Sequence, residues 1–222
     1  MIWEGKEIYM NEIIVVNHVT KIIKNAALLD NVNFTVERGT ISGIVGRNGS
    51  GKTVLFKCIC GFMNISSGSI EVDGKRMGQN GRLIENAGII IEEPGFIPIY
   101  SGLRNLMLLA NINHTISKEE IKDVMIKVGL DPSEKKAVKT YSMGMKQRLA
   151  IAQAVMENPD IIILDEPMNG LDDSGTQEIR KLFLDLKKEG KTFLIASHIK
   201  EDIDVLCDSV YRMDAGKLEK IS

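Results

Sequence analysis

Eight consecutive residues near the start of the chain have the types and spacing of a phosphate-binding loop. Residues 46–53 fit the pattern G-x-x-x-x-G-K-[ST] at every fixed position. Glycines let a backbone wrap closely around phosphate, because a Cβ would collide or forbid the required dihedral angles. The wrapped amides and the start of a following helix supply partial positive charge. The candidate nucleotide-binding residues are Gly46, Arg47, Asn48, Gly49, Ser50, Gly51, Lys52 and Thr53.

Two side chains of this loop carry the predicted chemistry. We expect Lys52 to reach the β- and γ-phosphates of a nucleoside triphosphate and the Thr53 hydroxyl to ligate Mg²⁺. The flanking segments fit this prediction, since residues 41–45 have the pattern of a buried strand and residues 52–62 that of a helix. The alternative is a glycine-rich turn that matches the pattern by chance.

A pair of carboxylates follows a second apolar strand. Residues 161–164 are aliphatic, and Asp165 and Glu166 come directly after them. Ligands of open α/β sheets bind at the carboxyl edge of the strands, where we expect these acids. Asp165 is predicted to hold Mg²⁺, directly or through water, and Glu166 to take a proton from the attacking water. The alternative is a strand that ends in a solvated acidic turn.

Two further signals point to the same site. His198 follows the apolar strand predicted at 192–196, which places it at the same sheet edge. A lone histidine is more often an ordinary surface or core residue. Ser142 and Gly144 open the helix that ends at Glu157, and such a helix start can bind an anion, although serine and glycine begin many helices.

The elements that must position these residues alternate between strands and helices. This order predicts an α/β fold with a mainly parallel sheet. The mostly helical stretch from about residue 100 to 157 has the character of an inserted subdomain. Strands are predicted at 13–16, 32–36, 41–45, 68–72, 88–91, 161–164, 192–196 and 209–213, and helices at 52–62, 103–110, 117–129, up to 157, 173–189 and 200–207.

Size and composition limit the class of protein. The 222 residues, 44% hydrophobic and 26% charged, predict one globular domain, with residues 1–10 as an N-terminal extension. A net charge of −2 gives no general attraction to nucleic acid. No segment approaches the ~18 apolar residues of a membrane span, so a membrane role requires a partner. Three cysteines without a secretory signal indicate a reducing compartment, and Cys58 and Cys60 are expected to be a buried pair rather than metal ligands.

These motifs, in this order, resemble the ATP-binding subunits of ABC transporters over nearly the whole chain. Residues 46–53 match the family's Walker A motif, and residues 161–166 match its Walker B motif with the following glutamate. Residues 142–147 are similar to the signature motif, which separates this family from other triphosphatases. Residues 169–172 resemble the D-loop, and His198 matches the switch histidine.

The resemblance implies a P-loop fold with an N-terminal antiparallel β part and a site shared by two subunits. ATP with Mg²⁺ would lie between the phosphate loop of one subunit and Ser142 and Gly144 of a second, identical or different, subunit. Glu166 would be the base, and His198 would hold the γ-phosphate and the water in line. The other partner would be a transmembrane permease, which places the chain on the cytoplasmic, inner face of the cell membrane. Residues from about 92 to 104 would carry movement to that permease.

Three positions depart from the usual family pattern. The signature usually reads Ser-Gly-Gly-Gln, and here Met145 removes its polar group, which weakens the expected nucleotide contact across the dimer. Glu92 stands where the family usually has glutamine; its carboxylate is still expected to bind Mg²⁺, but it adds negative charge near the triphosphate. Both variants resemble the ATPases of bacitracin-type export and lantibiotic self-protection. Ile23, or a close neighbour, takes the place of an aromatic that stacks on adenine, so an apolar contact is expected instead.

Three other functions each fit part of the pattern. A soluble ABC-type ATPase that acts without a permease is the main alternative, although such proteins usually carry paired nucleotide domains or long coiled-coil insertions. A non-enzymatic binding module is disfavoured because Lys52, Asp165, Glu166 and His198 are all present. A small-molecule kinase would leave the signature and His198 unexplained.

Overall fold

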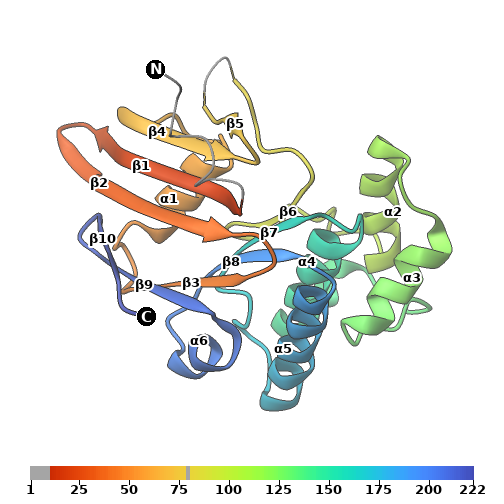
Figure 1. Cartoon of the computed structure of the whole chain (residues 1–222). Coiled ribbons are helices and arrows are strands. Elements are labelled where there is room, and N and C mark those ends of the chain that lie inside the picture. Colours follow the sequence, from red (N-terminus) through yellow and green to blue (C-terminus); the bar gives the residue numbers. More distant parts are fainter. Residues whose placement is uncertain (1–10, 79–80) are drawn as a thin grey trace.

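The computed structural model describes residues 11–78 and 81–222, whose strands form two sheets (Figure 1). The predicted α/β fold is confirmed, since strands and helices alternate through most of the chain. The extension expected at residues 1–10 lies outside the described residues. Within the described ranges, no helix has both the length and the apolar character needed to cross a bilayer.

A four-stranded antiparallel sheet, in the order β2-β1-β4-β5, contains the first two strands of the chain. Its β1–β2 hairpin is far longer than the strands predicted at 13–16 and 32–36. The prediction missed the added residues because they are largely polar or exposed and carry no apolar alternation. Lys24 and Asn25 form the turn, both with positive φ (47° and 67°), a geometry that matches the strand twist. The strands are β1 (Glu12–Ile23), β2 (Ala26–Glu37), β4 (Ser67–Val72) and β5 (Lys75–Arg76).

A six-stranded sheet, in the order β10-β9-β3-β8-β7-β6, brings the predicted site residues to one edge. Five of its strands pair in parallel, so their carboxyl ends lie together. The last strand, β10, runs antiparallel to β9 and was not predicted, because it is short and mostly exposed. The strands are β3 (Ile41–Val45), β6 (Ala87–Ile90), β7 (Ile161–Asp165), β8 (Thr192–Ala196), β9 (Ser209–Asp214) and β10 (Lys217–Lys220).

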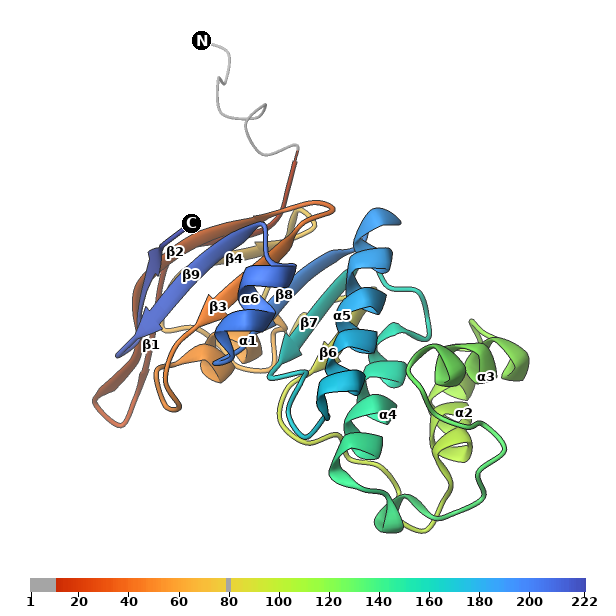
Figure 2. The same ribbon diagram turned by 90° about the horizontal axis from the view of Figure 1, so that it is seen from below.

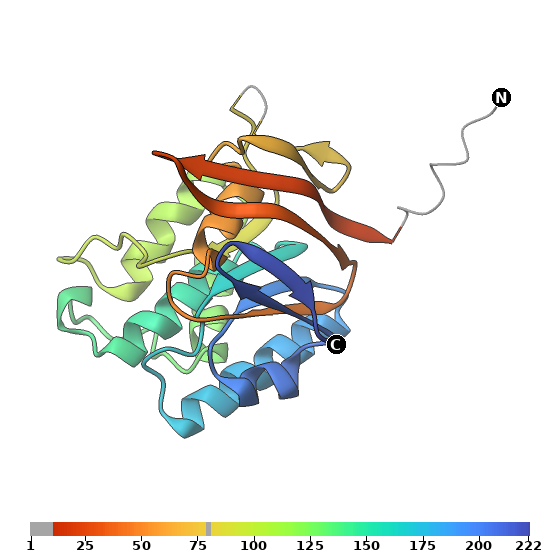
Figure 3. The ribbon, with the colours of Figure 1, turned by 90° about the vertical axis from the view of Figure 1, so that its left-hand side faces the viewer.

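The helices take three positions around the parallel sheet. Helix α1 lies between the two sheets (Figure 3). Helices α4, α5 and α6 cover the opposite face of the parallel sheet, and α2 and α3 project beyond its β6 edge (Figure 2). The helices are α1 (Lys52–Ile59), α2 (Gly102–Asn113), α3 (Lys118–Lys127), the short 3₁₀ helix η1 (Val138–Thr140), α4 (Met143–Val155), α5 (Asp173–Lys188) and α6 (Lys200–Leu206).

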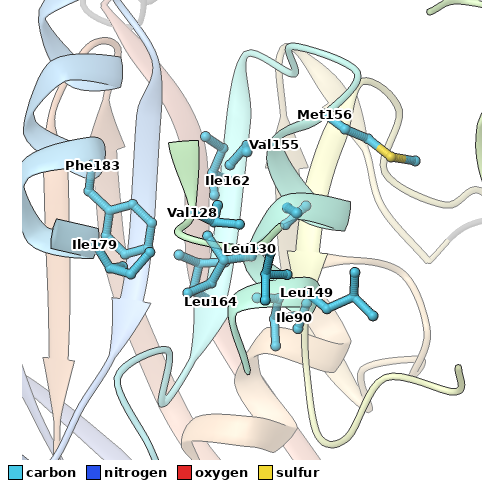
Figure 4. Close-up of a cluster of buried hydrophobic side chains, with 14 of the residues drawn as sticks. Ile90, Val128, Leu130, Leu149, Val155, Met156, Ile162, Leu164, Ile179 and Phe183 are labelled. Atoms are coloured by element: carbon cyan, nitrogen blue, oxygen red, sulfur yellow. The ribbon is translucent and has the colours of Figure 1, made fainter. Parts of the chain in front are cut away.

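The aliphatic run of β7 serves two hydrophobic cores. Ile161 and Ile163 belong to the core that contains α1 and the antiparallel sheet. Ile162 and Leu164 belong to the core formed with α4 and α5 on the other face (Figure 4). Successive side chains of a strand point to opposite faces, so a strand buried on both sides must be apolar throughout. This double burial fixes the strand that ends in the two candidate acids.

Helix α1 ends at Ile59, three residues before the predicted end at Phe62. Gly61 adopts a left-handed φ of 80°, and its N–H donates to the carbonyl of Cys58. A Cβ at Gly61 would lie 2.4 Å from the carbonyl oxygen of Arg82, so only glycine fits this helix end. The close approach of residue 82 comes from distant sequence and gives no local signal.

Segment 91–101, which joins β6 to α2, is fixed at its far end by one buried side chain. Asn105, on α2, is 4% exposed. Its Oδ1 accepts from the N–H of Ile97 at 2.7 Å, and its Nδ2 donates to the carbonyls of Ile97 and Ser101 at 3.2 and 3.0 Å. The segment is therefore tied to the helical part of the molecule by hydrogen bonds that are shielded from water.

The three cysteines provide a test of this packing. Burial raises the pKa of Cys58 to about 11 and the pKa of Cys60 and Cys207 to about 12. Since the thiolate is the reactive form, we predict that all three react with a thiol reagent at pH 8 more than tenfold more slowly than in urea-unfolded protein. Rapid labelling of Cys58 and Cys60 in the native protein would contradict their buried position.

Candidate functional site

The phosphate loop lies between the end of β3 and the start of α1, as the sequence predicts. Gly51 stands at the helix start with a φ of 117°, and a Cβ there would lie 2.9 Å from the carbonyl oxygen of Leu28. A Cβ on Gly46 would lie 2.3 Å from the carbonyl oxygen of Met213. Glycine is thus required at both positions by contacts with distant parts of the chain, and the loop that results is open toward solvent at Gly49.

A cavity of about 530 Å³ lies over this loop and is large enough for a nucleotide. The loop and the two acids after β7 form one side of it, and the β1–β2 hairpin and the β9–β10 turn form the other. Its lining residues are Ala27, Leu28, Arg47, Asn48, Gly49, Gly51, Lys52, Thr53, Val54, Asp165, Glu166, Ala215 and Gly216.

Lys52 places a positive charge inside the loop. Its side chain is only 6% exposed, and its Nζ donates to the carbonyl of Gly46 at 2.7 Å. A carboxyl oxygen of Glu166 lies 3.8 Å from the same nitrogen. The ammonium group is thus held among oxygen acceptors where a phosphate oxygen can replace or join them.

Thr53 and Asp165 meet across the gap between α1 and β7. The Thr53 hydroxyl donates to Oδ2 of Asp165 at 2.5 Å. A hydroxyl and a carboxylate held together in this way are the hard oxygen ligands that Mg²⁺ takes alongside phosphate oxygens. The parallel pairing of β7 with β8 and β6 fixes Asp165 at the sheet edge.

Glu166 and His198 form a hydrogen-bonded pair at the end of β7 and β8. The Oε2 atom of Glu166 lies 2.7 Å from Nδ1 of His198 and accepts from the backbone N–H of His198 at 3.3 Å. The other carboxyl oxygen, Oε1, is buried and has no hydrogen-bond partner. A buried carboxylate oxygen without a donor is costly, so this atom is available for a water molecule or a proton.

The His198 loop is supported by a buried ion pair behind it. Asp202, only 1% exposed, accepts from Nε and Nη2 of Arg180 at 2.9 and 2.6 Å. The Ser197 hydroxyl lies 3.2 Å from the other oxygen of Asp202 and accepts from the N–H of Ile199 at 3.1 Å. Residues on both sides of His198 are thereby anchored to α5 and α6. The sequence pattern gave no sign of this support.

Ser142 and Gly144 are not brought into the cavity. Ser142 is exposed at the start of α4, where its hydroxyl accepts from the N–H of Met145 at 3.2 Å. A Cβ on Gly144 would lie 2.8 Å from the carbonyl oxygen of Gly170, so the signature helix packs closely on the segment that resembles a D-loop. Within one chain, this helix start and the phosphate loop remain separate surfaces.

Glu92 also lies outside the cavity lining. It has a positive φ of 63°, and its Oε1 accepts from Nζ of Lys57 at 2.6 Å. Ile23 stands at the tip of the β1–β2 hairpin, 39% exposed, and is not among the lining residues. The hairpin residues that line the cavity are Ala27 and Leu28 instead, and an apolar contact with adenine stays a prediction.

The cavity is also lined by residues that the sequence analysis did not predict as part of the site. Ala215 and Gly216 form the β9–β10 turn, and the N–H of Gly216 donates to the carbonyl of Ser50 at 2.9 Å. The carbonyl of Gly216 accepts from the N–H of Asp30 at 2.8 Å. The Asp-Ala-Gly sequence at 214–216 is a turn signal that could have predicted this hairpin.

The residues present fit ATP with a divalent cation. Glu166 Oε1 is buried without a hydrogen-bond partner, and Glu166 lines the cavity. The Gly51 amide, the Lys52 ammonium and the Thr53–Asp165 oxygen pair supply the donors and ligands that a triphosphate and Mg²⁺ need. When bound, the cation would offset the charge of the phosphates and the neighbouring carboxylates.

A glycine loop between the parallel strand β3 and helix α1, with two acids at the end of β7, which is separated from β3 by β8 alone, defines a P-loop nucleoside triphosphatase. The sequence model of one such family, described as ABC transporter, matches residues 29–169, which is more than half of the chain. The chain therefore belongs to the ABC transporter ATPases, which bind and hydrolyse ATP, and it is an ATP-binding subunit of that family.

Related sequences bear this out across almost the full chain. The ABC transporter ATP-binding protein YybJ of Bacillus subtilis (strain 168) is 42% identical over 91% of this chain and 93% of its own length. The bacitracin transport ATP-binding protein BcrA of Bacillus licheniformis is 39% identical over 94% of this chain and 69% of its own. The lantibiotic transport ATP-binding protein SrtF of Streptococcus pyogenes is 35% identical over 91% and 87%.

Solved structures agree with the fold. An ATP-binding subunit of an ABC transporter superposes with a TM-score of 0.84 and 25% identity, covering 95% of this chain and 90% of the other. A dimeric bacterial ABC transporter cassette gives a TM-score of 0.84 at 23% identity over 94% of this chain and 99% of the other, a likeness of fold alone.

The buried ion pair behind His198 yields a prediction of stability. Changing Asp202→Ala leaves the buried Arg180 guanidinium with only its outer partner, Glu201, so we expect the free energy of unfolding to fall by about 3 kcal/mol. Glu201→Ala removes an acid that is 73% exposed, so the loss of unfolding free energy is expected to be much smaller than for Asp202→Ala. Urea unfolding of the two variants measures the difference, and equal losses would contradict the assigned burial.

Proposed function

We propose that this chain is the ATP-hydrolysing motor subunit of an exporter whose separate membrane permease carries peptide antibiotics of the bacitracin or lantibiotic kind. The relatives named for bacitracin and lantibiotic transport, at 39% and 35% identity, support this substrate class. The observation that carries the motor activity is the pair that Glu166, a residue lining the nucleotide cavity, forms with His198, while its other carboxyl oxygen has no hydrogen-bond partner and lies 3.8 Å from Nζ of Lys52.

Each candidate residue has a distinct role in the proposed reaction. The amides of residues 46–53 and Lys52 hold the phosphates, and Thr53 and Asp165, together with Glu92, provide ligands for Mg²⁺. Oε1 of Glu166 takes the proton of the attacking water, while His198 holds Oε2 and so orients the carboxylate. The attack then occurs in line with the bond to the leaving phosphate.

The proposal includes a second copy of the chain. Ser142 and Gly144 lie on a different surface from the phosphate loop. The start of α4 is exposed, and a helix N-terminus suits an anion. Two copies arranged head to tail would bring the signature helix of each one against the γ-phosphate bound by the other. ATP then joins the copies, and its hydrolysis separates them.

The permease would take up this movement at the inner face of the cell membrane. ABC ATPase subunits work with transmembrane permease subunits, and this supports a membrane partner here. Segment 91–101 is suited to the connection, because it starts at the sheet edge beside the nucleotide and is tied through Asn105 to the helical part. The exposed side chains of Ile97 and Ile99 on this segment offer apolar contacts to a partner.

Glu166→Gln tests the motor function directly. The amide keeps the shape of the side chain but cannot accept the proton, so we expect ATP turnover, measured with the co-purified permease, to fall by about 10²- to 10⁴-fold while ATP binding is retained. Cells that depend on the pair for antibiotic tolerance should lose it.

Glu189→Gln is the matched control, since this glutamate is exposed at the end of α5 and should leave turnover and tolerance unchanged. Unchanged tolerance in Glu166→Gln cells would refute the motor role. Turnover without a permease, and without sedimentation of the chain with membranes, would favour the soluble ATPase over a transporter subunit.

A further inference from the structure

The ion pair between Lys57 and Glu92 connects two segments that are far apart in sequence. Nζ of Lys57 lies 2.6 Å from Oε1 of Glu92, and the lysine side chain is 27% and the glutamate side chain 64% exposed. Lys57 follows Thr53 by four residues in α1, so the two side chains lie on the same face of the helix, one turn apart. Thr53 bonds to Asp165 and Lys57 bonds to Glu92, so one helix face holds an acid from each of two strand ends.

The backbone places Glu92 beside the candidate metal ligands. Strands β6 and β7 are parallel neighbours, with Ile90 opposite Leu164. Glu92 is therefore two residues past this pairing on the β6 side, as Glu166 is on the β7 side, and Asp165 is one residue past it on β7. Both glutamates have positive φ, 63° and 52°, an uncommon conformation that turns each chain sharply at the sheet edge.

We propose that Lys57 is a positioning residue for Glu92. Lys57 holds the Glu92 carboxylate one helical turn away from Thr53, and it competes with the bound metal for that carboxylate. This inference rests on the proposed function of Glu92 as a ligand of the magnesium nucleotide. The pair neutralises the charge that a carboxylate, unlike an amide, brings to this edge when no metal is bound. It also fixes the start of segment 91–101 to α1, while Asn105 fixes the end.

The strength of the pair suits an exchange of partners. Exposed lysine–glutamate pairs are weak, so a divalent cation with nucleotide can displace the ammonium group. On displacement, Glu92 turns toward Thr53 and Asp165, and segment 91–101 is released from α1 while Asn105 still holds its far end. The state of the phosphate site is thus transmitted to the segment proposed to face the permease.

The Mg²⁺ dependence of nucleotide binding tests this competition without measuring turnover. A fluorescent, non-hydrolysable ATP analogue is titrated with Mg²⁺ on the full chain. In Lys57→Met, Glu92 has no competing cation, so we expect the Mg²⁺ concentration at half-saturation to fall about two- to fivefold, the factor that corresponds to an exposed ion pair. In the Glu92→Gln background, the same Lys57→Met change is expected to leave only the slight shift that the loss of any nearby positive charge produces.

The Glu92→Gln background separates competition between Lys57 and the metal from the general effect of removing a positive charge. Loss of any positive charge near the site raises cation affinity slightly, and it does so whether or not residue 92 carries a carboxylate. Lys75→Met is the matched control, because Lys75 forms another exposed pair, with Glu85 at 2.5 Å, outside the cavity lining. Thermal unfolding of each variant verifies that the fold is retained.

Two outcomes overturn the inference. If Lys57→Met shifts the Mg²⁺ concentration at half-saturation equally with and without the Glu92→Gln change, the effect is due to bulk charge. If Lys57→Met leaves that concentration unchanged or raises it, Lys57 does not compete with the metal. In both cases the unaltered chain still binds the analogue, so the proposed function stands. Absence of binding by the unaltered chain would instead remove the proposed function together with this inference.

Discussion

The site depends on holding like charges together at one sheet edge. Asp165 and Glu166 at the end of β7 line the cavity proposed for a triphosphate, and Glu92 follows the neighbouring parallel strand β6. Such a cluster is stable only where positive groups and oriented dipoles offset it. Buried Lys52, the amides at the start of α1, and Lys57 at its next turn supply that charge, and the proposed cation completes it.

This constraint explains why the parts of the fold are connected as they are. Helix α1 begins at the phosphate loop, lies between the two sheets and carries Thr53 and Lys57 on one face. The buried strands β3, β7 and β8 deliver the loop, the acids and the histidine to a common edge (Figure 1). The buried pair of Arg180 and Asp202 then fixes the segment around His198 from behind. Rigid strands and anchored loops keep the reacting groups oriented before substrate arrives.

The predictable part of the fold and site is the part whose chemistry is local in sequence. The phosphate loop and the run of four aliphatics before Asp165 are each recognisable from fewer than ten consecutive residues. The structure brings together the site residues predicted from them and from the strand at 192–196, namely Lys52, Thr53, Asp165, Glu166 and His198. The family resemblance and the α/β fold were confirmed for the same reason.

The parts that sequence could not predict depend on distant contacts. The outer half of the β1–β2 hairpin is stabilised by pairing rather than by apolar alternation, so Ala27 and Leu28 were not expected at the cavity. The turn at Ala215 reaches the site only because β9 and β10 fold back beside the phosphate loop. The Lys57–Glu92 ion pair joins residues that are 35 positions apart, and the periodicity of neither segment predicts it.

The central claim is that one chain holds only half of a working site, because Ser142 lies outside the cavity that holds Lys52. Light scattering of the purified Glu166→Gln chain, with saturating ATP and Mg²⁺, measures this most directly. We expect the 24.6 kDa mass to double with ATP and Mg²⁺, and to return to that of the single chain when nucleotide is removed or when Ser142→Arg blocks the helix start. A mass that stays at one chain while ATP is fully bound would contradict the account.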